Sequence, residues 1–254
     1  MTQTERAKTF RDLHVKGNPL VLYNIWDAGS AKTLAGAGAK ALATGSAPVA
    51  MAQVFADGEQ TPLEWVYGIT SQIVANVDVP LSVDFEGAYA TDADTIAKNV
   101  VGLIEAGAVG VNFEDQIIGG NGLYDIGEQV KRIEAVRRGA DKAGVALFIN
   151  ARTDVFLKEA DLSKHADLMD EAILRANAFK EAGADCFFAP LLSDLGLIEQ
   201  LCDAVELPVN ILKKAENHTK EVLGPLGVAR ISYGGSAYMA LMGQFAETFK
   251  AISR

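Results

Sequence analysis

The chain has 254 residues, of which 49% are hydrophobic, and it carries a formal net charge of −10. This length and composition predict a single α/β domain over residues 1–254, and the acidic balance argues against nucleic acid or an anionic membrane as a partner. The sequence has no apolar run of the roughly 20 residues that a membrane span needs and no signal-peptide pattern at its start. Two cysteines give no disulfide framework, so we expect a cytoplasmic protein.

Strand and helix patterns alternate along the chain after a leading helix at 4–15. We expect strands at 19–24, 40–44, 80–84, 109–113, 146–151, 185–189, 208–212 and 228–232. We expect helices at 30–37, 62–76, 92–105, 125–143, 167–182, 194–204, 217–223 and 236–250. Eight strand–helix units in this length predict a (β/α)₈ TIM barrel. An open doubly wound sheet is the alternative, which the lack of a Gly-x-Gly-x-x-Gly turn after the first strand weakens.

Polar residues follow several of these strands, where the active site of such a barrel lies. They are Asn24 and Asp27, then Thr44, Gly45, Ser46 and Asp57, then Asp84 and Glu86, then Asn112, Glu114, Asp115 and Gln116, and finally Asn150, Arg152, Thr153 and Asp154.

Three acids at two neighbouring strand ends are the most informative feature. Asp84, Glu86 and Glu114 would repel each other unless a cation or a proton intervened, and carboxylates are good ligands for a hard cation. We therefore expect one Mg²⁺ among them. Each acid alone could instead cap a helix or pair with an arginine, and Asp115 and Asp154 are the better candidates for such structural roles. Arg152 could serve as a partner for these acids or bind a substrate carboxylate.

Several motifs in this order resemble the isocitrate lyase/phosphoenolpyruvate mutase superfamily. They are Asn24-Ile25-Trp26-Asp27-Ala28-Gly29-Ser30-Ala31, Ala43-Thr44-Gly45-Ser46, Asp84-Phe85-Glu86-Gly87-Ala88-Tyr89, Phe113-Glu114-Asp115-Gln116 and Ala151-Arg152-Thr153-Asp154. The resemblance implies a Mg²⁺-dependent enzyme, with Mn²⁺ as an alternative ion. Members make or break C–C or P–C bonds in small 2-oxo or 2-hydroxy acids through a metal-stabilised enolate of the pyruvate type. It also implies a homotetramer, a dimer of dimers, in which the last helix is exchanged between subunits.

The resemblance also assigns roles to residues. Asp84 would ligate the metal directly, whereas Glu86, Glu114 and Asp57 would act through water molecules. The Thr44–Ala47 segment would hold the substrate carboxylate through Ser46 and the N–H groups of Gly45 and Ala47, and Arg152 would clamp the oxyacid. The catalytic candidates are Asp57, Arg152 and Asn121, of which Asn121 lies where related mutases carry a loop asparagine.

The loop at 116–124 departs from the pattern of the cysteine lyases in this superfamily. It has no cysteine, whereas the thiol of those lyases supplies a proton, so we expect neither isocitrate nor methylisocitrate lyase activity. Cys186 and Cys202 lie on a predicted strand and a predicted helix, where small buried hydrophobic residues are the expected interpretation. We expect the glycine-rich loop to act as a lid over the site.

Three further positions, one among the metal-site acids and two at later strand ends, also depart from the family pattern. Pro190 stands where relatives have glutamate or histidine, Leu212 stands where they have asparagine, and Glu86 replaces an aspartate. Oxaloacetate or a related 2-oxo acid, cleaved by decarboxylation or hydrolysis, is therefore the preferred substrate. The first alternative is P–C bond chemistry of the phosphoenolpyruvate mutase or phosphonopyruvate hydrolase type.

Two further alternatives belong to other function classes. Lys213 or Lys214 could form a Schiff base in an aldolase, although surface lysines are the simpler interpretation. A barrel that binds metal and oxyacid without turnover is the other.

Overall fold

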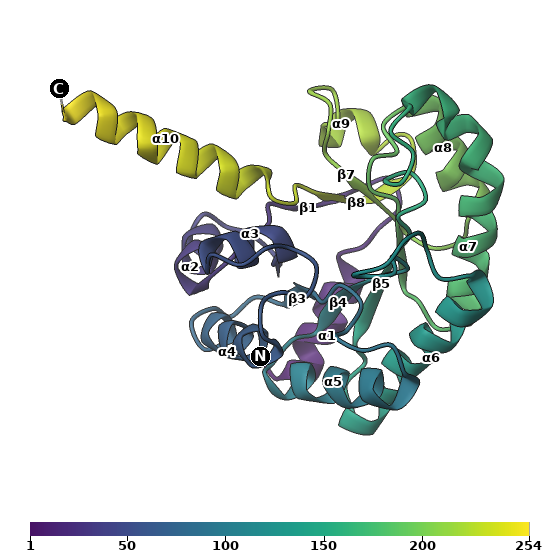
Figure 1. The fold of residues 1–254 in the computed structure, drawn as a ribbon, viewed down its shortest axis with the longest axis horizontal. Coiled ribbons are helices and arrows are strands. Elements are labelled where there is room, and N and C mark those ends of the chain that lie inside the picture. Colours follow the sequence, from purple (N-terminus) through teal and green to yellow (C-terminus); the bar gives the residue numbers. More distant parts are fainter. Residues whose placement is uncertain (254) are drawn as a thin grey trace.

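The computed structural model describes residues 1–253 and confirms the (β/α)₈ barrel (Figure 1). All paired strands are parallel and follow the order β1-β8-β7-β6-β5-β4-β3-β2. Their bounds are β1 Leu20–Leu22, β2 Leu42–Ala43, β3 Leu81–Asp84, β4 Gly110–Glu114, β5 Phe148–Arg152, β6 Cys186–Phe188, β7 Val209–Leu212 and β8 Val228–Ser232. Just past β1, the Ile25 N–H donates to Ala43 O at 2.9 Å and the Gly45 N–H to Ile25 O at 3.2 Å. These two bonds join β1 to β2 and nearly close the barrel.

The helices cover the outside of this sheet, one after most strands (Figure 1). Their bounds are α1 Gln3–Asp12, α2 Ala28–Gly36, α3 Ser46–Ala52, α4 Leu63–Val74, α5 Ala93–Glu105, α6 Ile126–Ala143, α7 Met169–Glu181, α8 Leu195–Ala204, α9 Lys220–Leu223 and α10 Ser236–Ile252, with a 3₁₀ helix at Leu162–Leu168. Six of them begin after an Asp or Thr side chain that accepts a first-turn N–H, as at Asp92 and Asp125. No helix within residues 1–253 combines the length and apolarity needed to cross a membrane.

The barrel interior is apolar at one end and polar in the middle. At the start of β5, His14 stacks on Phe148 with ring centroids 4.1 Å apart, so α1 and the turn after it close the N-terminal ends of the strands. Farther along the barrel axis, Arg230 is fully buried and donates to Asn112 Oδ1 and Ser232 Oγ, both at 3.2 Å. This polar layer forms a floor beneath the C-terminal mouth of the barrel.

Two short helices were missing from the expected elements. The segment after β2 forms α3, which begins at Ser46, and the 3₁₀ helix precedes α7. α3 is only seven residues long, too short to give a helical period in the sequence. Its position matters because it directs its first N–H groups into the mouth of the barrel.

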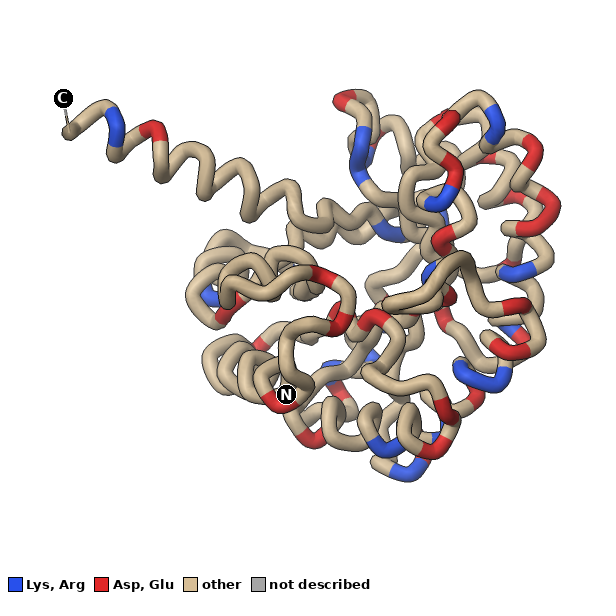
Figure 2. Tube along the Cα trace, in the orientation of Figure 1, with Lys and Arg blue, Asp and Glu red and all other residues tan. Residues whose placement is uncertain are grey.

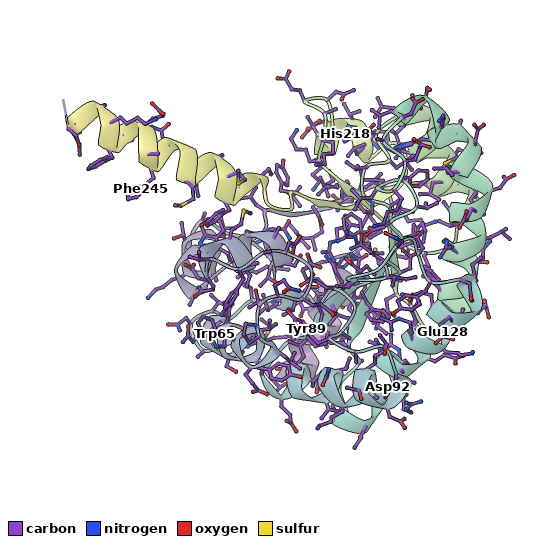
Figure 3. The ribbon with its side chains drawn as sticks, viewed as in Figure 1. Trp65, Tyr89, Asp92, Glu128, His218 and Phe245 are labelled. Atoms are coloured by element: carbon purple, nitrogen blue, oxygen red, sulfur yellow. The ribbon has the colours of Figure 1, made fainter. Side chains whose placement is uncertain are left out.

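Helix α10 extends away from the barrel instead of packing on it (Figure 1). Only Ala237 of this helix is buried, whereas Phe245, Phe249 and Ile252 are 72%, 64% and 78% exposed. The helix carries almost no charge (Figure 2), and Phe245 lies on the part that leaves the barrel (Figure 3). An exposed apolar face of this extent marks a protein interaction surface.

Candidate active site

A cavity of about 130 Å³ opens at the C-terminal ends of the strands. The predicted substrate and catalytic residues Ser46, Asp57, Asp84 and Arg152 line it together. The other lining residues are Asn24, Gly45, Ala47, Pro48, Asn112, Leu157, Phe188, Pro190, Leu212, Ser232, Gly234 and Gly235. The convergence follows from the parallel sheet, because Asp84, Asn112 and Asn150 share one register across β3, β4 and β5.

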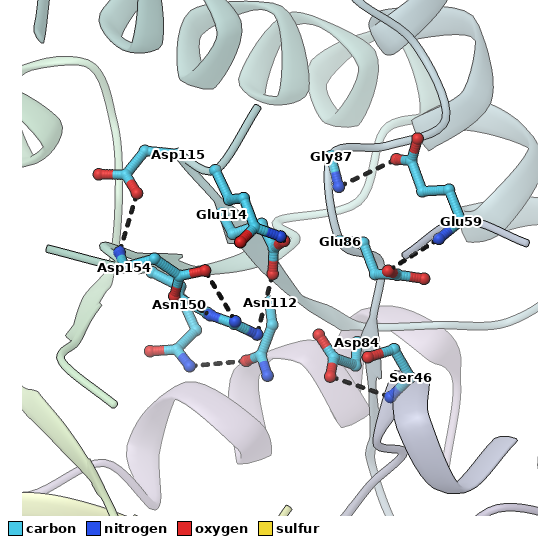
Figure 4. A network of polar contacts seen from close by, with 12 residues as sticks. Ser46, Glu59, Asp84, Glu86, Gly87, Asn112, Glu114, Asp115, Asn150 and Asp154 are labelled. Carbon is cyan, nitrogen blue, oxygen red and sulfur yellow. Dashed lines mark hydrogen bonds and ion pairs between the residues drawn. The ribbon is translucent and has the colours of Figure 1, made fainter. Parts of the chain in front are cut away.

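Asp84 is held rigidly at the edge of this cavity (Figure 4). Its N–H donates to Thr44 Oγ1 and its Oδ2 accepts from the Ser46 N–H, both at 3.0 Å. Its other oxygen, Oδ1, is buried and has no hydrogen-bond partner among the described residues. Burial raises the pKa of Asp84, although Arg152 and the Ser46 N–H oppose the shift. A buried carboxylate oxygen without a partner is costly unless a cation or a proton reaches it.

Glu86 and Glu114 share the acidic surroundings of Asp84. Burial, followed by the charges of Asp84, Asp57 and Glu114, raises the pKa of Glu86 to about 9. Burial also raises the pKa of Glu114 to about 8 against the favourable charge of Arg152. Asp57 and Asp84 thus lie close enough to Glu86 and Glu114 for their charges to disfavour ionisation of both glutamates.

Arg152 provides the positive charge on the β5 side of the cavity. Its Nη1 lies 2.8 Å from Glu114 Oε2, and its Nε and Nη2 contact the two oxygens of Asp154 at 2.5 and 2.9 Å. Burial alone would disfavour the guanidinium charge, but Glu114 and Asp154 outweigh burial and raise the pKa of Arg152. Arg152 therefore stays charged. It pairs with acids and also faces the cavity, so a role as their partner is compatible with a role in binding a substrate carboxylate.

Asp115 has the structural role that the sequence indicated. Its carboxylate accepts from the Thr153 hydroxyl at 2.7 Å, the Asp154 N–H at 2.9 Å and Arg175 Nη1 at 3.0 Å. These bonds tie the end of β4 to the end of β5 and so fix the direction of Arg152.

These acids suit a divalent cation that one of them ligates directly and the others hold through water molecules. No three His, Cys, Asp or Glu side chains within residues 1–253 are grouped so that they could hold one ion together. One carboxylate oxygen, Asp84 Oδ1, is buried and unpaired and suits a direct ligand. Mg²⁺ usually binds through one or two carboxylates and keeps several water molecules, so Glu86, Glu114 and Asp57 fit as partners of those waters.

The Thr44–Ala47 segment is partly occupied by internal hydrogen bonds. Gly45 N–H is bonded to Ile25 O and Ser46 N–H to Asp84, so neither is free for a substrate carboxylate in this arrangement. Thr44 does not line this cavity, and its hydroxyl instead accepts the hydrogen bond from the Asp84 N–H. Ala47 lies in the first turn of α3 and lines the cavity, which leaves its N–H directed toward the site.

One wall of the cavity is apolar. Leu157, Phe188, Pro190 and Leu212 form it, which places Pro190 and Leu212 beside the substrate space as expected. Cys186 is fully buried and Cys202 is 4% exposed, which confirms the expectation that they are buried. Burial raises the pKa of each thiol to about 12, so both remain protonated.

Several predicted residues do not line this cavity, and the metal-site acids Glu86 and Glu114 are among them. Asn121 is exposed in the 116–124 loop, whose ends pair between Gln116 and Leu123, so its catalytic role stays a prediction that requires loop closure. Lys213 and Lys214 are also absent from the lining, and Lys213 Nζ donates to the carbonyls of Ala215 and Glu216.

Glu59 and Arg132 near the site were not found by sequence reasoning. Glu59 contacts the loop that carries Glu86, and Arg132 contacts the same loop from α6. Neither belongs to a motif, and their contacts with this loop join residues 27 to 45 positions apart, so no local pattern indicates them.

Comparison with known proteins agrees with this geometry. A family model described as phosphoenolpyruvate phosphomutase matches residues 10–253. The chain belongs to this family. It is thus an enzyme of the isocitrate lyase/phosphoenolpyruvate mutase superfamily, whose members are generally dependent on a divalent metal.

Individual members of the superfamily differ in the reactions that their names give. An uncharacterized protein of Mycobacterium tuberculosis is 33% identical over 96% of this chain and 89% of its own length. The 2-methylisocitrate lyase of Escherichia coli is 29% identical over 92% of this chain and 80% of its own. The oxaloacetate decarboxylase of Pseudomonas entomophila is 26% identical over 91% and 79%. A solved structure of a putative phosphonomutase from Burkholderia cenocepacia superposes with a TM-score of 0.95 at 43% identity, covering 98% of this chain and 99% of that one.

Proposed function

We propose that this phosphoenolpyruvate mutase family member is a Mg²⁺-dependent lyase that cleaves a C–C bond in a small 2-oxo acid, with oxaloacetate as the preferred substrate. The unpaired, buried Oδ1 of Asp84 at the edge of the cavity is the observation that carries this proposal. Three further acids around it, with raised pKa values for Glu86 and Glu114, supply the charge that a divalent cation would neutralise.

The reaction that this site supports leaves negative charge on the substrate. In oxaloacetate the bond from C3 to the departing carboxyl breaks, CO₂ leaves, and the electron pair remains as the enolate of pyruvate, which takes up a proton at C3. A divalent cation, when bound, stabilises the charge on the enolate oxygen. Asp84 would ligate this ion, and Glu86, Glu114 and Asp57 would hold its water molecules.

The chain's own residues orient the substrate within the cavity. Arg152 presents its guanidinium beside Glu114 and Asp154 and would bind the oxyacid. The Ser46 side chain and the Ala47 N–H at the start of α3 would receive the substrate carboxylate. The apolar wall around Leu212 lacks charge and suits a fragment that leaves as neutral CO₂.

Exchange of the methyl protons of pyruvate in D₂O tests the enolate half of this proposal without any leaving group. We expect exchange, followed by NMR, in the presence of Mg²⁺ and its loss in excess chelator. A panel of oxaloacetate, other 2-oxo acids and 2-hydroxy acids with product identification then tests the leaving group. Exchange that is unaffected by chelator would refute the metal-dependent proposal.

P–C bond chemistry is the second candidate, because the solved structure with 43% identity is that of a putative phosphonomutase. Phosphonopyruvate in the same panel decides between the two. Release of phosphate, or conversion to phosphoenolpyruvate, at a higher kcat/KM than oxaloacetate cleavage would favour this candidate.

We also propose a homotetramer in which α10 is exchanged between subunits. The exposed apolar residues of α10, which include Met239, Leu241, Phe245 and Phe249, support this assembly. Light scattering of the full chain and of Phe245→Asp tests it, since the variant is expected to dissociate. A monomeric wild-type chain would refute the proposal.

A further inference from the structure

Glu59 joins two loops that carry site acids. It lies two residues after Asp57 in the segment between α3 and α4, and its Oε1 accepts from the N–H groups of Gly87 at 3.0 Å and Tyr89 at 2.7 Å. The N–H of Glu59 in turn donates to Glu86 Oε2 at 2.9 Å. Figure 4 shows that these bonds place Glu59 on the far side of Glu86 from Asp84. One residue therefore connects the Asp57 segment, the Glu86 side chain and the loop after β3.

The loop that Glu59 holds has an unusual backbone. Glu86, Ala88 and Tyr89 have φ angles of 51°, 63° and 56°, and Glu59 itself has φ 58°. Such left-handed conformations of non-glycine residues cost on the order of 1–3 kcal/mol each and persist only where the surroundings hold them. The two N–H groups bonded to the Glu59 carboxylate lie within this strained stretch, so Glu59 is one of the groups that maintain it.

Arg132 also holds this loop, through hydrogen bonds to its carbonyl groups. Its Nη2 donates to Gly87 O at 3.0 Å and its Nη1 to Ala90 O at 3.1 Å. Its Nε donates to Gln129 Oε1, and Gln129 Nε2 donates to the carbonyl of Glu114 at 3.1 Å. Gly87 is thus held at its N–H by Glu59 and at its C=O by Arg132, and the second contact continues to the strand that carries Glu114.

We propose that Glu59 is a positioning residue that sets Glu86 and the Asp57 segment around the divalent cation beside Asp84. Glu59 does not line the cavity that Asp84 and Arg152 line, so it acts through Glu86 and the backbone of the loop. The inference rests on the proposed function, because it assigns Glu59 a part in cation binding. Groups that orient metal-site residues in this way typically change metal affinity or activity by about 10–100-fold when removed.

Glu59→Ala and Glu59→Gln separate positioning from charge. The glutamine Oε1 can still accept both N–H groups, whereas alanine accepts neither. By calorimetry with Mg²⁺ alone, we expect the dissociation constant to rise at least about tenfold in Glu59→Ala and to stay within about threefold of wild type in Glu59→Gln. In the pyruvate exchange assay with Mg²⁺ present, we expect kcat to fall in Glu59→Ala with little change in the KM for pyruvate. Glu64→Ala, which removes an exposed acid nearby on α4, is the matched control and should match wild type.

Amide hydrogen exchange of residues 85–91 gives a readout independent of the cation. We expect faster exchange of the Gly87 and Tyr89 amides in Glu59→Ala but not in Glu59→Gln. Unchanged Mg²⁺ affinity in Glu59→Ala would overturn the proposal, and so would an equal loss of affinity in Glu59→Gln. If wild type itself binds no Mg²⁺, the proposed function fails, and amide exchange still decides whether Glu59 holds the loop.

Discussion

Replacing Arg152 by methionine removes the cation that faces two buried acids. Glu114 and Asp154 have side chains 4% and 0% exposed, and Arg152 pairs with both. Arg152→Met leaves the carboxylate of Asp154 buried without its partner. Removing one partner of a buried ion pair costs about 3–5 kcal/mol, because the remaining charge is not compensated. At roughly 2–4 °C for each kcal/mol, the melting temperature should fall by about 10 °C.

The loss should also depend on pH in a defined direction. Arg152 opposes the rise of the Glu114 pKa, which is about 8 in the wild type, so the variant should have a higher value. Stability falls as the pH rises from the unfolded pKa of a carboxyl group toward a raised folded pKa, because only the unfolded state ionises in that range. In the variant this range extends to a higher pH. Between pH 7 and 9 the variant should therefore lose up to about 1.4 kcal/mol per pH unit more than wild type.

Urea unfolding of Arg152→Met at pH 7, 8 and 9 measures both effects. Arg138→Met is the control, because Arg138 pairs with Asp94 at the surface, where the two side chains are 54% and 98% exposed. Loss of such a surface pair should change stability by less than about 1 kcal/mol. A free energy of unfolding of Arg152→Met that is no lower than that of Arg138→Met would refute this prediction. So would a difference from wild type that is the same at all three pH values.

Three further predictions concern residues outside the acidic cluster. Burial lowers the pKa of His14 to about 3. The unfolded state therefore binds a proton first as the pH falls, and the free energy of unfolding of wild type should drop by about 2 kcal/mol relative to His14→Phe between pH 6.5 and 5. Urea denaturation of both proteins at the two pH values measures this, and an equal change in the two proteins would contradict it. Cys186→Ala and Cys202→Ala should each leave kcat within about threefold of wild type, because protonated, buried thiols are poor catalysts; a hundredfold loss would reopen a cysteine lyase mechanism. Gly87→Ala should weaken Mg²⁺ binding measured by calorimetry, since its Cβ would lie 3.1 Å from Glu59 Oε1; unchanged affinity would show that the loop adapts.

The convergence of the acids was predictable because it follows from topology. Once Asp84 and Glu114 are placed at the ends of neighbouring parallel strands, the barrel brings them to one mouth. The positions of Pro190 and Leu212 at this mouth were predictable for the same reason. Alternating strand and helix patterns were thus enough to locate the site.

The contacts that tune the site were not predictable in this way. The hydrogen bonds of Glu59 depend on left-handed backbone at Glu86 and Tyr89, and non-glycine residues give no sequence signal for that conformation. Arg230 lies in a strand pattern that predicts an apolar interior, yet it is fully buried on the barrel axis. Helix α10 has the apolar pattern of a packed helix. The family resemblance, not this pattern, implied that it leaves its own barrel, and the structure shows that the barrel does not cover it.

The most direct test of the cation site at Asp84 is calorimetric binding of oxalate, a mimic of the pyruvate enolate, to wild type and Asp84→Ala with and without Mg²⁺. We expect wild type to bind oxalate only when Mg²⁺ is present. We expect Asp84→Ala to lose this metal-dependent binding while its fold, followed by circular dichroism, is retained. Equal oxalate affinity in the two proteins, or binding by wild type that is unchanged in excess chelator, would contradict the proposed cation site at Asp84.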